Sequence, residues 1–142
     1  RSIAFYRQAF GFELGLRVRR TAPWIAEIVL GEGIAGQTVG ARADLEFAHL
    51  HLSSGLHLEL IQYRAPEPRP AENELSWRHG HQHLCLTVAA IESWVERARK
   101  AGARMVSPAP VVIPEGKNSG SKCCYLRGPD RETIELFEPV TP

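Results

Sequence analysis

Two glutamates hold the same place in two similar stretches of this chain, and the carboxylate is a group that can carry a proton or bind a metal ion. Glu59 lies in the stretch from Gly55 to Tyr63 and Glu135 in the stretch from Asp130 to Glu138, each between large apolar residues. Neighbouring residues of a strand point to opposite faces, so each glutamate is expected on the face opposite its buried neighbours. One such glutamate is usually only a solvated residue, whereas two in matching positions indicate an internal repeat.

Length and composition predict one globular domain that acts on small molecules. The chain has 142 residues, of which 44% are hydrophobic and 23% charged, which is enough for a core of ordinary size. Its formal net charge of +1, with both signs scattered, gives no electrostatic footprint for nucleic acid. No apolar run approaches the ~20 residues of a membrane span. Cys123 and Cys124 are adjacent and the number of cysteines is odd, so no disulfide framework is expected, and the expected location is the cytoplasm.

Hydrophobic periodicity divides the chain into two halves of similar order. The first half is expected to contain a helix and three strands, and the second half a strand, a helix and three strands. Residues 21–27 are expected either to begin a short helix or to overlap a strand over 24–30. The other predicted elements are helices over 2–10 and 91–101, strands over 12–19, 44–52, 56–63, 83–88, 103–107, 122–127 and 132–138, and loops over 31–42 and 108–120.

The two halves differ by one strand. Gly11 and Gly102 are expected to end the two helices, because glycine adopts the left-handed conformation that follows a helix. When these glycines are aligned, the strand that begins at His83 has its counterpart upstream of Arg1, so the first strand of the first half is expected to be missing from the chain. A sheet that lacks a strand has an unpaired edge, which proteins usually cover or pair, and a homodimer is therefore expected.

Four short pieces of the chain carry a resemblance when they are taken together. They are Ser2-Ile-Ala-Phe-Tyr6 with Phe10-Gly-Phe12-Glu13, then Leu58-Glu-Leu60, then Gly80-His-Gln-His83-Leu84, and finally Tyr125-Leu-Arg-Gly-Pro-Asp130 with Ile134-Glu-Leu136. Each piece is weakly specific, but their order and spacings cover nearly the whole chain. Together they resemble the vicinal oxygen chelate superfamily, which includes glyoxalases, methylmalonyl-CoA epimerases, extradiol dioxygenases and the fosfomycin- and bleomycin-resistance proteins.

The resemblance implies an α+β fold of two tandem βαβββ modules, which form curled mixed sheets around a cavity. It also implies that one divalent metal ion binds inside that cavity. The ligands implied are Glu59, His83 and Glu135, with a further residue, usually histidine, from the absent strand. The implied organisation is a single glyoxalase-like domain over 1–142, with module one at 1–63, a linker at 64–80 and module two at 81–142.

A ligand set of nitrogen and oxygen atoms suits Zn, Ni, Co, Mn or Fe, and the sequence does not choose among these metals. The implied activity is that of a glyoxalase-like isomerase or lyase, which moves a proton next to a carbonyl while the metal ion stabilises an enediolate. Glu135 and Glu59 are the candidate proton carriers. The alternative is a metal-free protein of the bleomycin-resistance type that binds and sequesters a small molecule. Two buried carboxylates would cost an apolar pocket several kcal/mol, which favours the enzyme.

Some residues depart from the resemblance or have an open role. The superfamily usually has aspartate at the position of Gly128 and glycine at that of Arg131, so the last turn is expected to be built differently here. His57 shares the predicted face of Glu59 and is a candidate to orient a metal ligand through a hydrogen bond. The other histidines are expected to be surface or hydrogen-bonded residues, namely His49, His51, His79 and His81.

Overall fold

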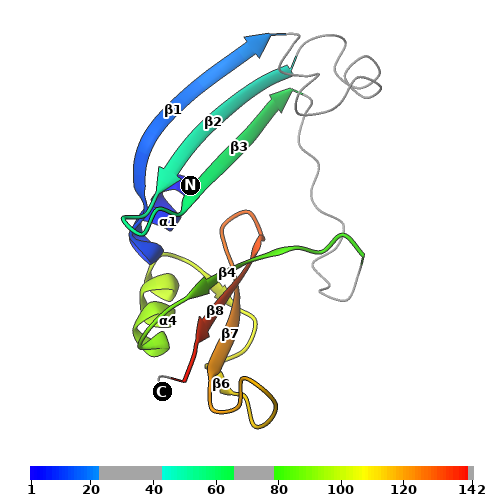
Figure 1. Cartoon of the computed structure of the whole chain (residues 1–142). Helices are drawn as coiled ribbons and strands as arrows, with labels where there is room; N and C mark the ends of the chain where they lie inside the picture. Colours follow the sequence, from blue (N-terminus) through cyan, green and yellow to red (C-terminus); the bar gives the residue numbers. More distant parts are fainter. Residues whose placement is uncertain (23–42, 66–78, 141–142) are drawn as a thin grey trace. The chain divides into compact units, whose positions relative to one another are not determined.

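Strands dominate the chain, and they lie in two separate sheets (Figure 1). The computed structural model describes residues 1–22, 43–65 and 79–140. Residues 12–22 and 43–65 form one compact unit, which we call the sheet unit. Residues 1–11 and 79–140 form another, which we call the mixed unit. The α+β class predicted from the sequence is confirmed.

The sheet unit is an antiparallel sheet of three strands in the order β1-β2-β3. Gly55, with a φ of 90°, lies in the turn between β2 and β3, and its N–H donates a hydrogen bond of 2.9 Å to the carbonyl of Leu52. The strands predicted in this unit are confirmed with shifted ends. They are β1 (Glu13–Ala22), β2 (Ala43–His51) and β3 (His57–Ala65), the last of which extends two residues into the predicted linker.

The end of β1 corrects one prediction. Thr21 pairs with Asp44 of β2, so the short helix expected to begin at residue 21 is wrong for the two residues of it that the structure describes. Nε of Arg19 donates a hydrogen bond of 2.7 Å to Oδ1 of the same Asp44. The neighbouring strand thus overrides the weak capping signal of a lone threonine. The predictions that fall outside the described residues are the strand over 24–30, the loop over 31–42 and most of the linker over 64–80.

The mixed unit contains a sheet in the order β4-β8-β7-β5, with β6 also paired to β7. β4 runs parallel to β8, and the other pairs are antiparallel. β6 lies inside the predicted loop over 108–120, whose prolines favour a loop because proline cannot donate a ladder hydrogen bond. The strands are β4 (His83–Thr87), β5 (Arg104–Met105), β6 (Val111–Val112), β7 (Lys122–Arg127) and β8 (Thr133–Glu138).

The two predicted helices, α1 (Ser2–Phe10) and α4 (Ile91–Lys100), are both present in the mixed unit. Gly11 follows α1 with a φ of 77°, and Gly102 lies just beyond α4 with a φ of 96°, so both glycines adopt the left-handed conformation expected of them. No helix in the described part of the chain is long and apolar enough to cross a membrane.

A side chain from β8 caps the start of α4. The carboxylate of Glu138 accepts hydrogen bonds from the backbone N–H groups of Ala90, at 2.7 Å, and Ile91, at 3.3 Å. These N–H groups have no partner within the helix, so the cap satisfies them and places a negative charge at the positive end of the helix dipole. The cap also fixes the end of β8 relative to α4.

The core of the mixed unit lies between α4 and one face of its sheet. α4 contributes Ile91 and Val95, and β8 contributes Ile134 and Leu136, all of which are buried. Because side chains alternate along β8, burying Ile134 and Leu136 turns Glu135 to the other face of the sheet. The packing of the core therefore sets the direction of this candidate site residue.

α1 packs against α4 through aromatic side chains. The ring of Phe10 stacks on that of Trp94 with 6.4 Å between centroids, and Phe5 meets Phe10 edge-on at 5.6 Å. The guanidinium of Arg97 lies over the ring of Trp94 at 4.6 Å. α1 therefore belongs to the unit that holds the sheet of the second half, although the sequence assigns it to module one. The module boundaries and the single domain stay predictions.

The turn between β7 and β8 is closed by the side chain of Glu132. Its carboxylate accepts hydrogen bonds from the backbone N–H of Asp130, at 2.9 Å, and from the hydroxyl of Tyr6, at 3.2 Å. A side chain at position 128 would collide with this carboxylate, so Gly128 leaves the space it needs. Arg131 adopts a φ of 71°, the left-handed conformation for which glycine is favoured. The turn is thus built around a carboxylate from position 132 rather than position 128.

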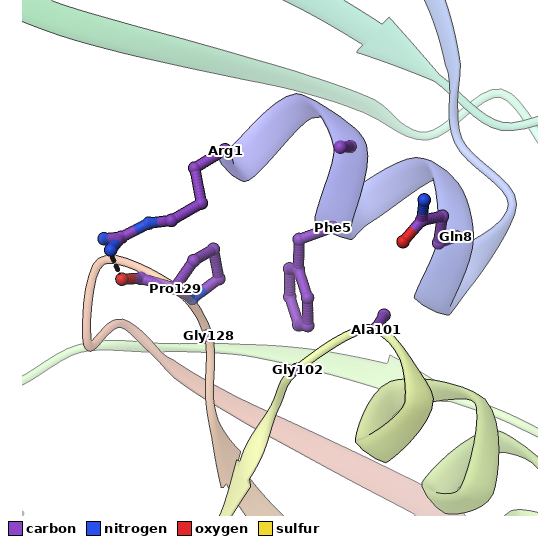
Figure 2. A pocket seen from close by; sticks show the side chains of 8 residues that line it. Arg1, Phe5, Gln8, Ala101, Gly102, Gly128 and Pro129 are labelled. Atoms are coloured by element: carbon purple, nitrogen blue, oxygen red, sulfur yellow. Dashed lines mark hydrogen bonds between the residues drawn. The ribbon is translucent and has the colours of Figure 1, made fainter.

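The start of α1 is attached to the same turn. Arg1 donates hydrogen bonds to the carbonyl of Pro129 and to the carboxylate of Asp130, and the first of these bonds is drawn in Figure 2. A shallow pocket of about 440 Å³ adjoins these contacts, with Phe5 and Gln8 of α1 on one side (Figure 2). None of the predicted site residues lines this pocket. The pocket is therefore separate from the candidate site described below.

Replacing Gly128 with alanine is expected to lower the free energy of unfolding by about 1–3 kcal/mol, because the added methyl group displaces the Glu132 carboxylate from its two hydrogen bonds. Urea unfolding measures the change. In a Glu132→Ala background the same substitution should cost much less, since the obstructing carboxylate is gone. An equal cost in both backgrounds would show that Glu132 is not the obstacle.

Candidate functional site

The face of the mixed unit's sheet opposite α4 carries a group of polar side chains. Cys85 on β4 and Tyr125 on β7 are each in register with Glu135 on β8. Because β8 lies between β4 and β7, these two side chains flank Glu135 on the same face. His83 and Cys123 share this face, each two residues away along its strand. We call these five residues the Glu135 cluster.

His83 and Glu135 are in direct contact, with 3.0 Å between Nε2 and Oε2. Their side chains are 38% and 16% exposed, so solvent reaches the imidazole while the carboxylate is largely enclosed. Cys85 and Tyr125 flank Glu135 on the neighbouring strands, opposite it in register. The structure thus brings together two of the three residues predicted to bind a metal ion.

Tyr125 and the two thiols of the Glu135 cluster are held in their neutral forms. Burial, followed by the nearby charge of Glu135, raises the pKa of Tyr125 to about 12. Burial and the same charge raise the pKa of Cys85 and of Cys123 above the usual range of a thiol. A neutral thiol is a poor nucleophile and a poor metal ligand. The donors that remain in the cluster are therefore the imidazole nitrogen and the carboxylate oxygens.

Glu59 lies in the sheet unit and has a histidine partner of its own. It is on β3, in register with His49 on β2, and Oε1 of Glu59 is 3.2 Å from Nε2 of His49. Both side chains are about half exposed. On the same face, His51 lies opposite His57, with 6.2 Å between the ring centroids, and 3.6 Å from Glu13. Each candidate glutamate thus contacts an imidazole.

Comparison with known proteins places the chain in a family. A family model described as the Glyoxalase/Bleomycin resistance protein/Dioxygenase superfamily matches residues 1–136. The chain belongs to this superfamily. The resemblance stated from the four sequence pieces is therefore confirmed.

The chain is similar to several individual members of the superfamily at low sequence identity. It is 27% identical over 138 residues to a 2-epi-5-epi-valiolone epimerase from Actinomyces sp, an alignment that covers 96% of this chain and 70% of that protein. A glyoxalase family protein from Bacillus cereus is 24% identical with a TM-score of 0.74, and the match covers 99% of this chain and 86% of that one. Glyoxalase I from Zea mays is 18% identical with a TM-score of 0.62, covering 98% of this chain and 42% of that one. Both of these structures share the fold of this chain.

The sequence analysis does not identify two residues of the site. They are His49, which lies opposite Glu59 and contacts it, and Tyr125, which lies opposite Glu135. A signal for both exists in the hairpin turns. Tyr125 and Glu135 each lie five residues from Asp130, and His49 and Glu59 each lie five residues from Ser54. Because the centre of a turn sets the register of a hairpin, counting outward from it finds the opposite residue.

The donor chemistry of the site suits the divalent metal ion that the superfamily resemblance implies. His83 offers a nitrogen next to an oxygen of Glu135, and the flanking thiols are neutral, which matches the nitrogen and oxygen environment expected from the sequence. Among the residues of the described ranges, no three histidine, cysteine, aspartate or glutamate side chains converge into a metal site. The set of Glu59, His83 and Glu135 spans both units and stays a prediction.

Proposed function

We propose that this chain is a metal-dependent isomerase or lyase of the glyoxalase and epimerase type, which removes and returns a proton at a carbon next to a carbonyl. The observation that carries the proposal is the contact between His83 and the enclosed carboxylate of Glu135, since it joins a metal-ligating group to a group that can act as a base. Membership of the superfamily and the similarity to a protein named an epimerase support the isomerase type.

The proposed ligands of the metal ion are Glu59, His83 and Glu135, and the proposed proton carriers are Glu135 and Glu59. When bound, a divalent ion would stabilise the negative charge that develops on the substrate oxygens as the proton leaves carbon. Glu135 takes that proton on its carboxylate and returns it to the same carbon or to the neighbouring one. Glu59, the matching residue of the other half, gives the chain a second carboxylate for the return step.

The proposed substrates are small carbonyl compounds with an oxygen on the adjacent carbon, such as hydroxy ketones and thiol adducts of keto aldehydes. Two neighbouring oxygens can both bind a divalent ion. The hydrogen that a base can remove is on the carbon that carries the second oxygen, next to the carbonyl. The epimerase that the chain is similar to is named for a compound with a ketone ending, which supports the hydroxy ketone class. Its named compound is therefore a suitable first probe.

The full-length purified protein is expected to contain one divalent metal ion per chain. Elemental analysis after gel filtration into metal-free buffer measures the ratio, and a chelator followed by Zn, Ni, Co, Mn or Fe tests which ion restores it. A protein that takes up no ion under any of these conditions would contradict the proposed function. The metal-free, small-molecule-binding alternative would then be the better account.

A further inference from the structure

We propose that a row of apolar side chains beside Glu135 holds an apolar arm of the substrate, so that the protein favours carbonyl compounds that carry such an arm over those that lack it. The inference rests on the proposed function, in which the substrate reacts at Glu135. It narrows the substrate classes named above to their members with a hydrocarbon group of several carbon atoms.

The row crosses three neighbouring strands. Cys123 on β7 is in register with Phe137 on β8 at one side and with Val111 on β6 at the other. Residues in register share a face of the sheet, and Cys123 lies on the face of Glu135, so the whole row lies on that face. We call Val111, Cys123 and Phe137 the apolar row. Phe137 is two residues along β8 from Glu135, a rise of roughly 7 Å.

A second valine widens the apolar row at its outer side. Met105 on β5 pairs with the buried Leu126, so the next residue, Val106, turns to the opposite face. The N–H of Val106 donates a hydrogen bond of 2.9 Å to the carbonyl of Tyr125, which keeps it beside β7. Val106 thus lies next to Tyr125, on the face that carries Glu135.

The side chains at the outer end of the apolar row are open to a ligand. Val111 is 54% exposed and Val106 is 57% exposed. Burial and the charge of Glu135 raise the pKa of Cys123, so its thiol stays neutral and behaves as a small apolar group. Ligand sites typically combine an apolar lining with a few polar groups that fix orientation, which is the combination that the row and the Glu135 cluster form.

The occupant of the apolar row follows from its place beside the reacting group. A substrate that reacts at Glu135 lies across this face, and its remaining atoms meet either the apolar row or solvent. An apolar arm that extends along β8 reaches Phe137 first and then turns across β7 toward Val111. Covering these side chains removes apolar surface from water, which favours binding of the compound that has the arm.

The test compares two hydroxy ketones that differ in the arm alone. Hydroxyacetone has no apolar arm, whereas hydroxymethyl hexyl ketone has one. NMR in D₂O measures kcat/KM for deuterium exchange at the hydroxymethyl carbon of each. The wild-type protein should exchange the hexyl compound with a kcat/KM about 10–100-fold higher, since each methylene group that is buried contributes to binding.

The variant Val111→Thr replaces one methyl group of the apolar row with a hydroxyl of similar size. It should lower kcat/KM for the hexyl compound by about 3–10-fold, mainly through KM, and leave hydroxyacetone unchanged. The matched control is Val112→Thr on the same strand. Val112 is also 54% exposed, but it is in register with Lys122 and therefore lies on the opposite face. It should leave both substrates unchanged.

Binding at the apolar row is also measured without the reaction, from the NMR shifts of the Val111 methyl groups at two protein concentrations. Shifts caused by the hexyl compound would support the proposal, whereas shifts caused by protein concentration alone would assign the row to a second copy of the chain and overturn it. Equal kcat/KM for the two ketones, or equal effects of the two threonine variants, would overturn the apolar arm and leave the proposed function intact. Exchange of neither ketone would count against the proposed function, and the methyl shifts would still decide whether the row binds the hexyl compound.

Discussion

Replacing Glu135 with glutamine is expected to slow solvent-deuterium exchange at the α-carbon of a substrate by about 10²–10⁴-fold, the usual contribution of a general base. Glutamine keeps the size of the side chain and a carbonyl oxygen that can bind a metal ion weakly, but it has no basic oxygen. The variant should therefore stay folded and keep part of its metal. NMR in D₂O measures the exchange, with 2-epi-5-epi-valiolone as one probe and a thiol adduct of an α-keto aldehyde as another.

A second glutamine variant shows whether the loss is specific. Glu96→Gln changes a carboxylate on the surface of α4, which pairs with Lys100 at 2.7 Å and is 67% exposed. It should exchange at the wild-type rate. If Glu135→Gln also exchanges at that rate, Glu135 is not the base, and Glu59→Gln becomes the variant to measure.

Replacing His83 with alanine is expected to remove the metal ion before anything else. His83 is the one imidazole among the three proposed ligands. Its loss also removes the contact that its Nε2 makes with Oε2 of Glu135. An outer partner of a ligand is worth about 10–100-fold in affinity, so a lost ligand should lower the affinity by on the order of 10²-fold or more. Competition titration of the metal-free protein measures the affinity, and proton exchange should fall in proportion to the metal lost.

The control for this variant is the histidine two residues earlier. Nε2 of His81 lies 3.3 Å from the hydroxyl of Thr133 on β8. His81 is therefore expected to hydrogen-bond to the strand and not to bind the metal ion. His81→Ala should bind metal like the wild type. Normal metal content in His83→Ala would remove His83 from the ligand set and leave its contact with Glu135 as a structural one.

The helices and most strands could be predicted because their signals are local. Apolar spacing identifies α1 and α4, and Gly11 and Gly102 mark their ends through a left-handed conformation that other residues avoid. The faces of Glu59 and Glu135 follow in the same way from alternation with apolar neighbours. Each of these signals depends on residues within a few positions of one another.

The features that escaped prediction depend on residues that meet only in the folded chain. Glu138 caps a helix that begins 47 residues earlier, and a pattern read along the sequence does not pair the two. Thr21 carries a capping signal that the pairing with Asp44 overrides. Glu132 closes the turn between β7 and β8, because Gly128 leaves room for its carboxylate, and the sequence pattern does not single out this residue.

Only part of the candidate site could be predicted, because some of its contacts join residues that are distant in the sequence. His83 and Glu135 follow from matching the two halves with the superfamily pattern, and the structure brings them into contact. Tyr125 and His49 are found only when the pairing of strands is added to the pattern of each strand. Periodicity gives the face of a residue, whereas register gives its partner.

In the proposed function, residues of the Glu135 cluster transfer a proton with the help of a bound metal ion. The most direct measurement is deuterium exchange by the wild-type protein as purified, after chelation, and after one equivalent of metal is returned, with metal content followed by elemental analysis. Exchange should be lost when the ion is removed and recovered when it is returned. Exchange that continues unchanged in protein shown to be metal-free would contradict the claim.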